Sequence, residues 1–534
     1  MVDAKQFRLR YDKAMEQSQL WYSILQRLYD YTMPERGEFA YKKYRAGQRR
    51  NRRLYDDTAP NALTQWSSQT LLAMFGENWL TLDPGKDVTE PNSSIDPQLA
   101  AQKCQEAQDT FMEHFNQSNF QYAMFQSLME VGISTGIILI TKGTWDNPLH
   151  FTSVPLHEVC LVPGPRDTIN DVFRTYKVPA GVMEQTWPGI KMPDDLKRLA
   201  KANPVEDVEL IEGTVYNHDA PKDKAYSYIV MRKDGNEVLH EEFMALSPWV
   251  VIRSKVLNGE VVGRGIAFDV QGSIYAINQM QKQELKSSSW NSGPVWLDYT
   301  GSSINPNTAR LEPGMMIPIQ PSVNGGPGIQ QLKVDAGLRV EQFTSDQLRQ
   351  QINNAFNVNP LGNVTDPGDK TATEISARQD HWYKINAAAE ARLIQAKEQI
   401  FHVCWNILHS FGYVNTPKVD GRKIKVEFAS LATKTQATDE INKLVQFSQY
   451  LNALGGPDVV QAGLSYGLDI TEIPDWLAEK LNIDKTLLRG ALGKEQYMKA
   501  AQQQMAQQQA PTASQAPMQQ PTEPLQPGLQ TLGG

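Results

Sequence analysis

The amino-acid sequence predicts an α+β fold that is predominantly helical and divided into several units. Three observations support this prediction. Alternating apolar residues between 132 and 256 indicate strands, two helical patterns flank a turn-rich segment at 290–335, and an unusually long helical pattern ends at Gly412. A chain of 534 residues is also long enough to bury about three separate cores.

Residues 1–265 are expected to combine helices with an α/β part. Helical periodicity covers residues 62–75 and 99–131, and the phenylalanines of these stretches suit a core. Strand periodicity follows at 137–141, 208–216, 226–232 and 249–255. The turn at 263–265 is interpreted as the start of the next helix, because it lacks the third glycine of a dinucleotide-binding fingerprint.

A protruding hairpin is predicted between residues 266 and 356. The segment 266–289 has apolar residues every three or four positions and a glutamine-rich opposite side, as expected for an amphipathic helix. Residues 290–335 are rich in Gly, Pro, Asn and Ser, which predicts a small β-rich unit with long turns. A second helix at 336–356 then returns, so the small unit stands at the end of two helices.

The longest predicted helix follows a loop at 357–370 that is rich in Gly, Pro and Asp. Thr371 and Glu374 have the spacing of a capping box, in which each side chain accepts from the backbone amide of the other residue. Apolar residues then recur every three or four positions until Gly412, which supplies a C-terminal stop. At 1.5 Å per residue this helix spans roughly 60 Å. The pattern predicts a mobile tip on a rigid arm.

The C-terminal part is expected to hold a further helical module. Residues 423–428 alternate like a strand and close a unit that spans 371–432, and several shorter helices follow at 433–501. From 502 to 534 the chain is rich in Gln, Pro and Ala and has too few large apolar side chains to offset chain entropy. This tail is expected to be disordered, or helical only where neighbours supply a partner.

The net charge of −8 argues against nucleic-acid binding over the whole surface, because such binding needs Lys and Arg to neutralise phosphates. One run differs from the acidic average and contains no acidic residue. Two interpretations fit it equally: a solvated loop, or a contact with phosphate or an acidic partner. Its seven basic residues are Lys42, Lys43, Arg45, Arg49, Arg50, Arg52 and Arg53.

Cysteine usage and hydropathy indicate the compartment. Cys104, Cys160 and Cys404 are far apart and include no CxxC pair, so they indicate neither a disulfide framework nor a cysteine zinc site. The amino terminus lacks the apolar core of a signal peptide, and the longest dense apolar run, 136–140, is far too short to cross a bilayer. We therefore expect a soluble chain of a reducing compartment with no membrane-spanning segment.

No sequence motif indicates an enzyme. The segment 362–371 differs from a P-loop, because Asp369 separates Gly368 from Lys370 and the spacer has five residues where a P-loop has four. Neither a GxSxG elbow nor an HExxH pair occurs. We expect no catalytic residue, no cofactor and no metal site.

The remaining clusters of reactive side chains have structural interpretations. His150, His157 and Cys160 straddle expected strands and have no matching second pair, which favours structural roles over metal binding. The aspartate pairs at 56–57 and 194–195 are interpreted as turn and cap residues in preference to paired catalytic carboxylates.

Four sequence blocks follow one another along the chain: Leu71-Leu72-Ala73-Met74-Phe75 with Trp79-Leu80, Ser118-Asn119-Phe120 with Gly132 and Gly136, Val262-Gly263-Arg264-Gly265, and Thr371-Ala372-Thr373-Glu374-Ile375. In this order they resemble the portal, or head-to-tail connector, of short-tailed, podovirus-type bacteriophages over residues 31–509. Two positions depart from the family pattern: Gly76 stands where a proline is expected, and Val262 where an aromatic residue is usual.

The resemblance implies a ring, usually of twelve subunits, at one capsid vertex, through which double-stranded DNA is packaged and later ejected. It implies a place in the virion at the portal vertex, after assembly in the host cytoplasm. The implied partners are the major capsid and scaffolding proteins, the terminase, the tail adaptor and internal core proteins. The packaging ATPase then belongs to the terminase, which fits the missing P-loop.

The resemblance also assigns a region of the portal fold to each part of the chain. The wing, stem, clip and crown follow one another in the order that the residue patterns already indicate. The regions are the wing (1–265), first stem helix (266–289), clip (290–335), second stem helix (336–356), channel loop (357–370), long wing helix with the following strand (371–432), helical crown (433–501) and a tail (502–534) that is either a crown barrel or disordered.

A pore for DNA must not bind it tightly, because every bound phosphate slows translocation. The two predicted stem helices carry nearly balanced charge, so we expect a low-friction lining with transient backbone contacts. An alternative is that Lys370 pairs only with Glu374 on the first helical turn. The expected channel contacts are Asn357, Asn359, Asn363, Thr365 and Lys370.

Two other functions remain as alternatives. The first is another ring-forming neck or tail adaptor of a phage particle, and the second, of lower weight, is a nucleic-acid enzyme that uses the basic run at 42–53. The apolar stripes of the first stem helix and the long helix also allow two interpretations. They contact the neighbouring subunit of a ring, whose interfaces are heterologous, or they are buried within one subunit.

Overall fold

The computed structural model has the mixed helix and strand composition that the sequence predicts. The chain divides into two units, Met1–Gln436 and Ala437–Gly534, and the elements below belong to the first. In the second unit the described residues include helical positions at 440–447. The structure describes residues 3–36, 39, 54–76, 79–83, 97–235, 237–293, 296–298, 314–318, 329–331, 338–358, 393–414, 425–428, 440–447, 449–450, 453 and 476–477.

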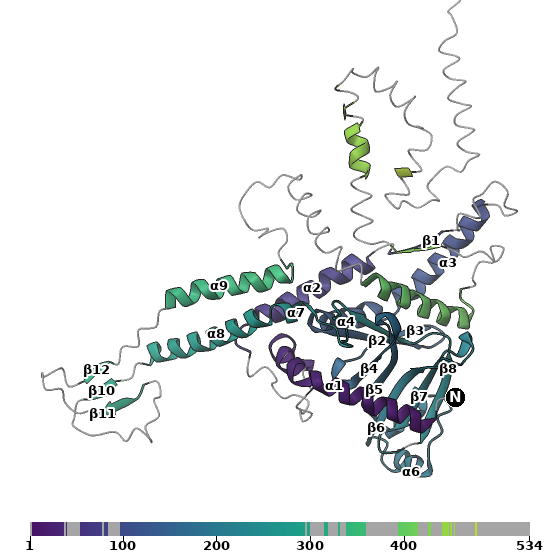
Figure 1. Ribbon diagram of the computed structural model, residues 1–534, viewed down its shortest axis with the longest axis horizontal. Coiled ribbons are helices and arrows are strands. Elements are labelled where there is room, and N and C mark those ends of the chain that lie inside the picture. The colour runs from purple at the N-terminus through teal and green to yellow at the C-terminus, as the bar shows by residue number, and fades with distance from the viewer. Residues whose placement is uncertain are drawn as a thin grey trace, which may run out of the picture. The chain divides into compact units, whose positions relative to one another are not determined.

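A five-stranded antiparallel sheet of order β4-β5-β6-β7-β8 has a helix on each face (Figure 1). Phe7 and Tyr11 of α1 (Ala4–Thr32) pack on the Phe173 ring and on Ile211 from one side. Leu210 points to the opposite side, because strand side chains alternate, and packs with α5 (Met183–Thr186) and α6 (Asp194–Ala202). The strands are β4 Val159–Pro163, β5 Ile169–Pro179, β6 Asp207–Tyr216, β7 Tyr226–Arg232 and β8 Val238–Met244.

The main core surrounds a three-stranded sheet of order β3-β2-β9. The central strand β2 (Thr135–Lys142) is buried on both faces over its first six residues, as its continuous apolar run suggests. Both neighbours, β3 (Leu149–Ser153) and β9 (Trp249–Arg253), are antiparallel to it. The helix α4 (Phe120–Ile133) packs on this sheet, and α2 (Thr58–Phe75) packs on α4. The helix α3 (Pro97–Gln117) contacts the sheet through the rings of Phe115 and Phe151.

The helical stretch expected at 99–131 is two helices, because Asn119 turns away from the helical backbone to bind a strand edge. Its amide Nδ2 donates to the Phe151 carbonyl at 2.8 Å, and its Oδ1 accepts from the Phe151 amide at 2.9 Å. The Ser118 hydroxyl accepts from the Phe120 amide at 3.3 Å. Asn and Ser side chains commonly replace helical bonds in this way. The break therefore fixes α3 and α4 to β3.

A close backbone approach joins α4 to the turn that starts the hairpin. The Gly265 amide donates to the Ile133 carbonyl at 3.1 Å, and a Cβ on Gly265 would overlap the Gly132 carbonyl. The helix expected at 266–289 begins as a single turn, α7 (Ile266–Asp269), which is buried in the core, and resumes as α8 (Gln271–Ser292). The first turns of α8 stay in the core beyond the break at Val270, because Ile274 and Ile277 are buried there.

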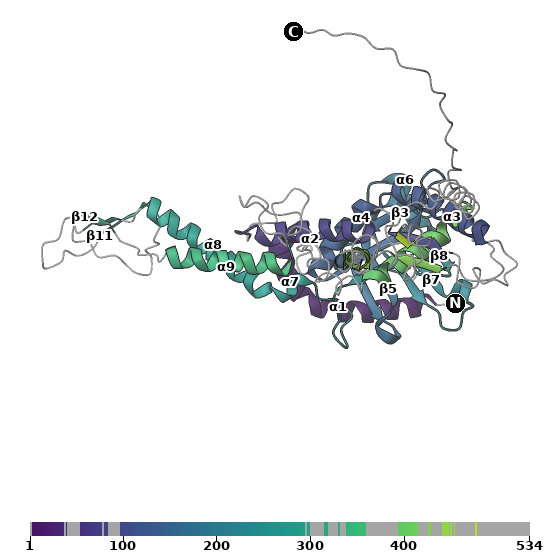
Figure 2. The same ribbon diagram turned by 90° about the horizontal axis from the view of Figure 1, so that it is seen from above.

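The hairpin itself consists of α8 and α9 (Leu338–Ala355), which lie side by side in both views (Figures 1 and 2). A small sheet of order β11-β10-β12 follows directly after α8, at the end of the pair that lies away from the main core. The central strand of this sheet, β10, is parallel to β11 and antiparallel to β12. The strands are β10 Trp296–Asp298, β11 Met316–Pro318 and β12 Ile329–Gln331.

A two-stranded sheet joins distant parts of the chain. The strand β1 (Leu80–Asp83) pairs antiparallel with β13 (Lys425–Phe428), which lies within the strand expected at 423–428. The helix at 393–411 packs beside them, with Phe401 against Phe111 of α3 and against Phe428. The first half of the expected long helix, 371–392, lies outside the described residues.

A buried carboxylate fixes the end of α1 to α4. Glu130 is fully buried and accepts from the Tyr29 hydroxyl and from Arg36 Nη1, the latter at 3.0 Å. Arg36 Nη2 also donates to Gln126 at 2.7 Å. Burial raises the pKa of Glu130, although Arg36 and Tyr29 act in the opposite direction. Because a buried charge needs such partners, the contacts define one position for the α1 end.

Candidate functional site

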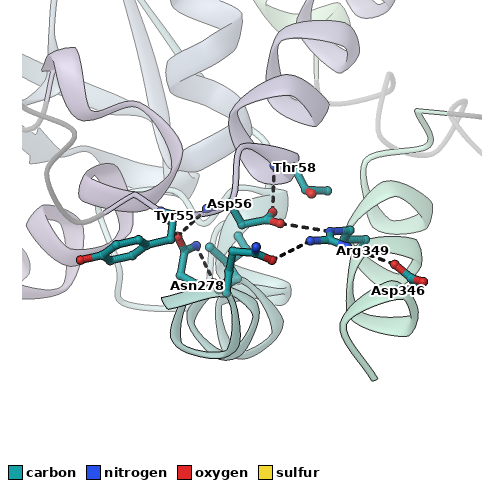
Figure 3. A network of polar contacts seen from close by, with 8 residues as sticks. Tyr55, Asp56, Thr58, Asn278, Asp346 and Arg349 are labelled. Carbon is teal, nitrogen blue, oxygen red and sulfur yellow. Dashed lines mark hydrogen bonds and ion pairs between the residues drawn. The ribbon is translucent and has the colours of Figure 1, made fainter. Parts of the chain in front are cut away.

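The base of the hairpin is fixed to the segment that precedes α2, mainly through Asn278 of α8. Its Oδ1 accepts from the Tyr55 amide at 3.0 Å and from the Asp56 amide at 3.2 Å (Figure 3). Its Nδ2 donates to the Ile274 carbonyl at 2.9 Å. Asn278 is only 2% exposed, so these bonds form away from bulk water. The described contacts of Asn278 therefore hold α8 to the start of α2.

Arg349 of α9 completes this base. Its Nε donates to Asp56 Oδ2 at 3.1 Å, Nη2 donates to Gln281 Oε1 at 2.9 Å, and Nη1 donates to Asp346 Oδ1 at 3.0 Å (Figure 3). The other Asp56 oxygen accepts from the Thr58 amide at 3.0 Å. Asp56 thus contacts α2 directly, α9 through Arg349, and α8 through its own amide. We call the hydrogen bonds that Asn278, Asp56 and Arg349 make with one another and with their neighbours the hairpin base.

The hairpin base pairs a buried carboxylate, Asp56, with a guanidinium, Arg349, whose pKa is raised. Asp56 is 7% exposed, while Arg349 is partly exposed. Burial lowers the pKa of Arg349, but its hydrogen bonds and ion pairs with Asp56 and Asp346 outweigh this, so the pKa is raised. The guanidinium therefore stays charged opposite a carboxylate that is shielded from water.

The aspartates at 56–57 and 194–195 lie at helix starts, as the sequence suggests, and Asp56 also pairs with Arg349. Asp56 caps the first turn of α2, and Asp57 occupies the N-cap position without a side-chain bond. Asp195 lies in the first turn of α6 and pairs with Arg232 at 2.7 Å. The pairing of Asp56 with Arg349 was missed, because no local pattern links residues 293 positions apart.

Asn357 ends α9 in a left-handed conformation, with φ of 51°. Its amide donates to the Asn354 carbonyl at 3.1 Å, and the Val358 amide donates to the Asn353 carbonyl at 3.0 Å. This pair of bonds is the Schellman motif, and asparagine tolerates the left-handed conformation better than most residues. Asn357 therefore terminates α9 at the position where the expected channel loop begins.

The same motif ends the helix at 393–411. Gly412 has φ of 81°, its amide donates to the His409 carbonyl at 3.0 Å, and the Tyr413 amide donates to the Leu408 carbonyl at 3.1 Å. Gly412 is thus the C-terminal stop that the sequence predicts.

Most of the other expected site residues lie outside the described part of the chain. The structure brings Asn357 alone of the expected channel contacts into view, and its conformation is that of a helix cap. The positions outside are Asn359, Asn363, Thr365 and Lys370 of the loop, Thr371 and Glu374 of the capping box, and the basic run Lys42, Lys43, Arg45, Arg49, Arg50, Arg52 and Arg53.

Charge on the hairpin helices is nearly balanced. The α8 sequence has two lysines and one glutamate, and the α9 sequence has two arginines, one aspartate and one glutamate, which gives +1 and 0. A surface of this kind offers phosphate few ion pairs.

The described residues include no group of three or more His, Cys, Asp or Glu side chains placed to hold a metal ion. His150 is exposed on β3, the His157 ring contacts Phe39, and Cys160 Sγ lies 3.7 Å from Met15 Sδ. None of the helices that the structure describes is both long and apolar enough to cross a membrane.

Removing the Arg349 guanidinium should loosen α9. In Arg349→Ala the buried Asp56 carboxylate loses its ion pair, which costs about 1–3 kcal/mol. Hydrogen exchange measured by mass spectrometry should then show faster exchange over 344–356. Asp346→Ala removes another partner of Arg349, but Asp346 is 70% exposed, so exchange over 344–356 should stay near the wild-type rate. Equal exchange in both variants would contradict the role given to Asp56.

The cap at Asn357 should tolerate glycine and reject β-branched residues. Asn357→Val forces a β-branched residue into the left-handed region at a cost of about 1–2 kcal/mol, and exchange over 353–358 should accelerate. Asn357→Gly should leave that exchange unchanged or slower. If exchange over 353–358 were the same with valine as with glycine, the left-handed conformation of residue 357 would be contradicted.

Comparisons with known proteins give a family and a relative. The family model described as bacteriophage head to tail connecting protein matches residues 4–488. A probable portal protein of Bordetella phage BPP-1 is 20% identical over 533 residues, which cover 94% of this chain and 92% of the relative.

Two solved structures also show similarity. One is the virion of a native gene transfer agent particle, with 11% identity and a TM-score of 0.35, and the other is the neck of an empty gene transfer agent particle computed with C6 symmetry, with 12% identity and a TM-score of 0.32. Each match covers 79% of this chain and 90% of the other.

Proposed function

Because the chain belongs to the bacteriophage head to tail connecting protein family, we propose that it is a portal subunit, which forms a ring at one capsid vertex. The observation that carries this proposal is the family match, which spans residues 4–488 and so includes nearly every described element. Double-stranded DNA passes through the ring when the genome is packaged and when it is ejected.

The portal regions correspond to the described elements as follows. The elements up to the turn at 263–265 form the wing, the helices α8 and α9 form the stem, and the small sheet at 296–331 belongs to the clip. The helix at 393–411 is part of the long wing helix, and residues 433–501 form the crown. The hairpin base supports this assignment, because it fixes the direction in which a stem would leave the wing.

The ring has twelve subunits in this proposal, and the particle has a short tail. The terminase docks on the clip during packaging, and the tail attaches afterwards through a tail adaptor. The major capsid, scaffolding and internal core proteins are the other partners in this proposal. The subunit carries out no catalysis, since the packaging ATPase belongs to the terminase.

The channel loop at 357–370 contacts the DNA backbone transiently as it slides. Asn357, Asn359, Asn363 and Thr365 offer uncharged hydrogen-bonding groups, and Lys370 adds one positive charge per subunit. The near balance of charge on α8 and α9 supports this low-friction lining. The basic run at 42–53 is a second contact, with phosphate or with an acidic partner.

Location in the particle tests the function directly. Antibodies against the chain, visualised with gold in electron micrographs of particles, should label one vertex per capsid. Particles made without the chain should be heads that lack DNA. Labelling along the tail, together with DNA-filled heads, would identify a tail adaptor and overturn the proposal.

The charge of Lys370 should affect how well packaged DNA is held. In Lys370→Ala we expect the fraction of DNA-filled particles that survive a moderate salt challenge to fall by several-fold, because one phosphate contact per subunit is lost. Glu374→Ala removes the alternative partner of Lys370 and serves as the matched control. If Lys370 served only as a cap partner, Glu374→Ala would reproduce the loss.

A further inference from the structure

Four aromatic side chains meet at the turn between β2 and β3. Trp145 of this turn is 65% exposed, and its ring centroid lies 5.5 Å from that of Phe411 and 5.7 Å from that of Tyr413. The Tyr413 ring in turn lies 4.4 Å from the His114 ring of α3. We call these four residues the aromatic cluster. Single exposed apolar residues are common, whereas contiguous aromatic groups on a surface often mark a contact with a partner.

The turn that carries Trp145 is attached to the rest of the wing. The Tyr413 hydroxyl donates to the Trp145 carbonyl at 2.7 Å, which ties the turn to the end of the helix at 393–411. Within the turn, the Asn147 amide donates to the Thr144 hydroxyl at 3.3 Å. A side chain that is already ordered loses less conformational entropy when a partner covers it. The Trp145 ring is therefore prepared for binding.

The aromatic cluster has the chemistry to bind a cation. The face of an indole ring carries partial negative charge and attracts a guanidinium or ammonium group more strongly than a phenyl ring does. Two exposed carboxylates adjoin the cluster in sequence, because Asp146 follows Trp145 and Glu113 precedes His114. An apolar partner would cover these carboxylates without a counter-charge, which costs free energy, whereas a basic side chain would pair with them.

The described part of the chain supplies no cation to the Trp145 ring. The described arginine and lysine side chains that lie over aromatic rings use other rings, as Arg27 does over Tyr275 at 4.1 Å. Lys142, three residues before Trp145, pairs with Glu242 at 3.3 Å. The exposed ring is therefore open to a basic side chain from a partner.

The aromatic cluster lies far from the start of the stem. The Ser134 hydroxyl donates to the Gly263 carbonyl at 2.8 Å, so β2 begins beside the turn that precedes the hairpin. Its eight residues extend about 25 Å at 3.3 Å per residue, and Trp145 follows beyond its end. In both views the helix at 393–411 lies away from the small sheet of the hairpin (Figures 1 and 2). In a ring whose stem surrounds the channel, this end of the wing faces outward.

We propose that the aromatic cluster binds an arginine or lysine side chain of the capsid shell protein, with the cation over the Trp145 ring and next to Asp146. This inference rests on the proposed portal function, because the shell protein is what surrounds the outer side of a ring at a capsid vertex. The cluster then supplies one cation-binding site per subunit for attachment of the ring to the shell.

Fluorinated tryptophans at position 145 test the cation directly. Each fluorine withdraws electrons from the ring face and so weakens cation binding, with little change in the shape of the ring. The fraction of purified capsids with a gold-labelled vertex should fall stepwise, by several-fold in total, as the ring carries none, one, two and three fluorines. Incorporation that is independent of fluorination would indicate a purely apolar contact and overturn the proposal.

A change of charge beside the ring gives an independent measurement. Asp146→Lys should also lower the labelled fraction several-fold, because the new ammonium group repels the incoming cation or takes its place over the ring. Asp219→Lys changes an equally charged, exposed aspartate in the turn between β6 and β7 and should match the wild type. Equal incorporation of the two variants would contradict the assignment.

A photo-reactive amino acid in place of Asn147, which is exposed, identifies the partner. Illumination of assembled capsids should give adducts with the shell protein, and the same group at position 219 should not. Adducts with a second copy of the chain, or no adduct, would reject the proposal. Wild-type chain that labels one vertex in the same experiment would limit that failure to this inference, whereas unlabelled wild-type capsids would overturn the portal function as well.

Discussion

The position of the α8/α9 hairpin depends on one buried carboxylate. Asp56 accepts from Arg349 of α9 and from the first turn of α2, and its own amide binds Asn278 of α8. At 1.5 Å per residue the 22 residues of α8 extend about 33 Å, so a rotation of about 10° at the base moves the far end by about 6 Å. Apolar packing also holds the start of α8, because Ile274 and Ile277 are buried in the main core and the Tyr275 ring contacts the Tyr31 ring of α1. The hydrogen bonds of the hairpin base add directional contacts that help to set the direction of α8 and α9.

The hairpin base and the exposed side of α9 differ in how they hold charge. At the base, charge is buried and paired, which gives Arg349 and Asp56 a single geometry. On the exposed side of α9, Asp346 is charged and 70% exposed, and the neighbouring exposed residues Gln347 and Gln350 are uncharged. In the proposed portal the same helix therefore combines a rigid attachment with an exposed side that carries little charge. The overall charge of −8 fits such a passage better than it fits a protein that grips DNA.

The sequence predicted elements where a local signal was strong. The periodicity of α8 and α9, the stop at Gly412 and the strands β2, β6, β7 and β9 all follow from spacing or from a single residue type. The break between α3 and α4 was missed, because it depends on the pairing of Asn119 with Phe151, which is 32 positions away. Strands near His150 and Cys160 were expected, but the bounds of β3, β4, β5 and β8 were not predicted. The first two have only five residues each, and the apolar residues of β5 and β8 do not alternate regularly.

The features of the candidate site also divide into those that local sequence signals predicted and those that depend on tertiary folding. The portal resemblance could be stated from four short blocks, and the family match confirms it. The Asp56 and Arg349 pair could not be predicted, since it arises from tertiary folding alone. The expected channel contacts beyond Asn357 stay predictions, because they lie outside the described residues.

Electron microscopy of the purified chain tests the central claim, that this subunit closes into a ring around a passage for DNA. Class averages at high protein concentration and moderate salt should show particles with rotational symmetry and a central opening. A monodisperse monomer with normal helix content under the same conditions would contradict the account.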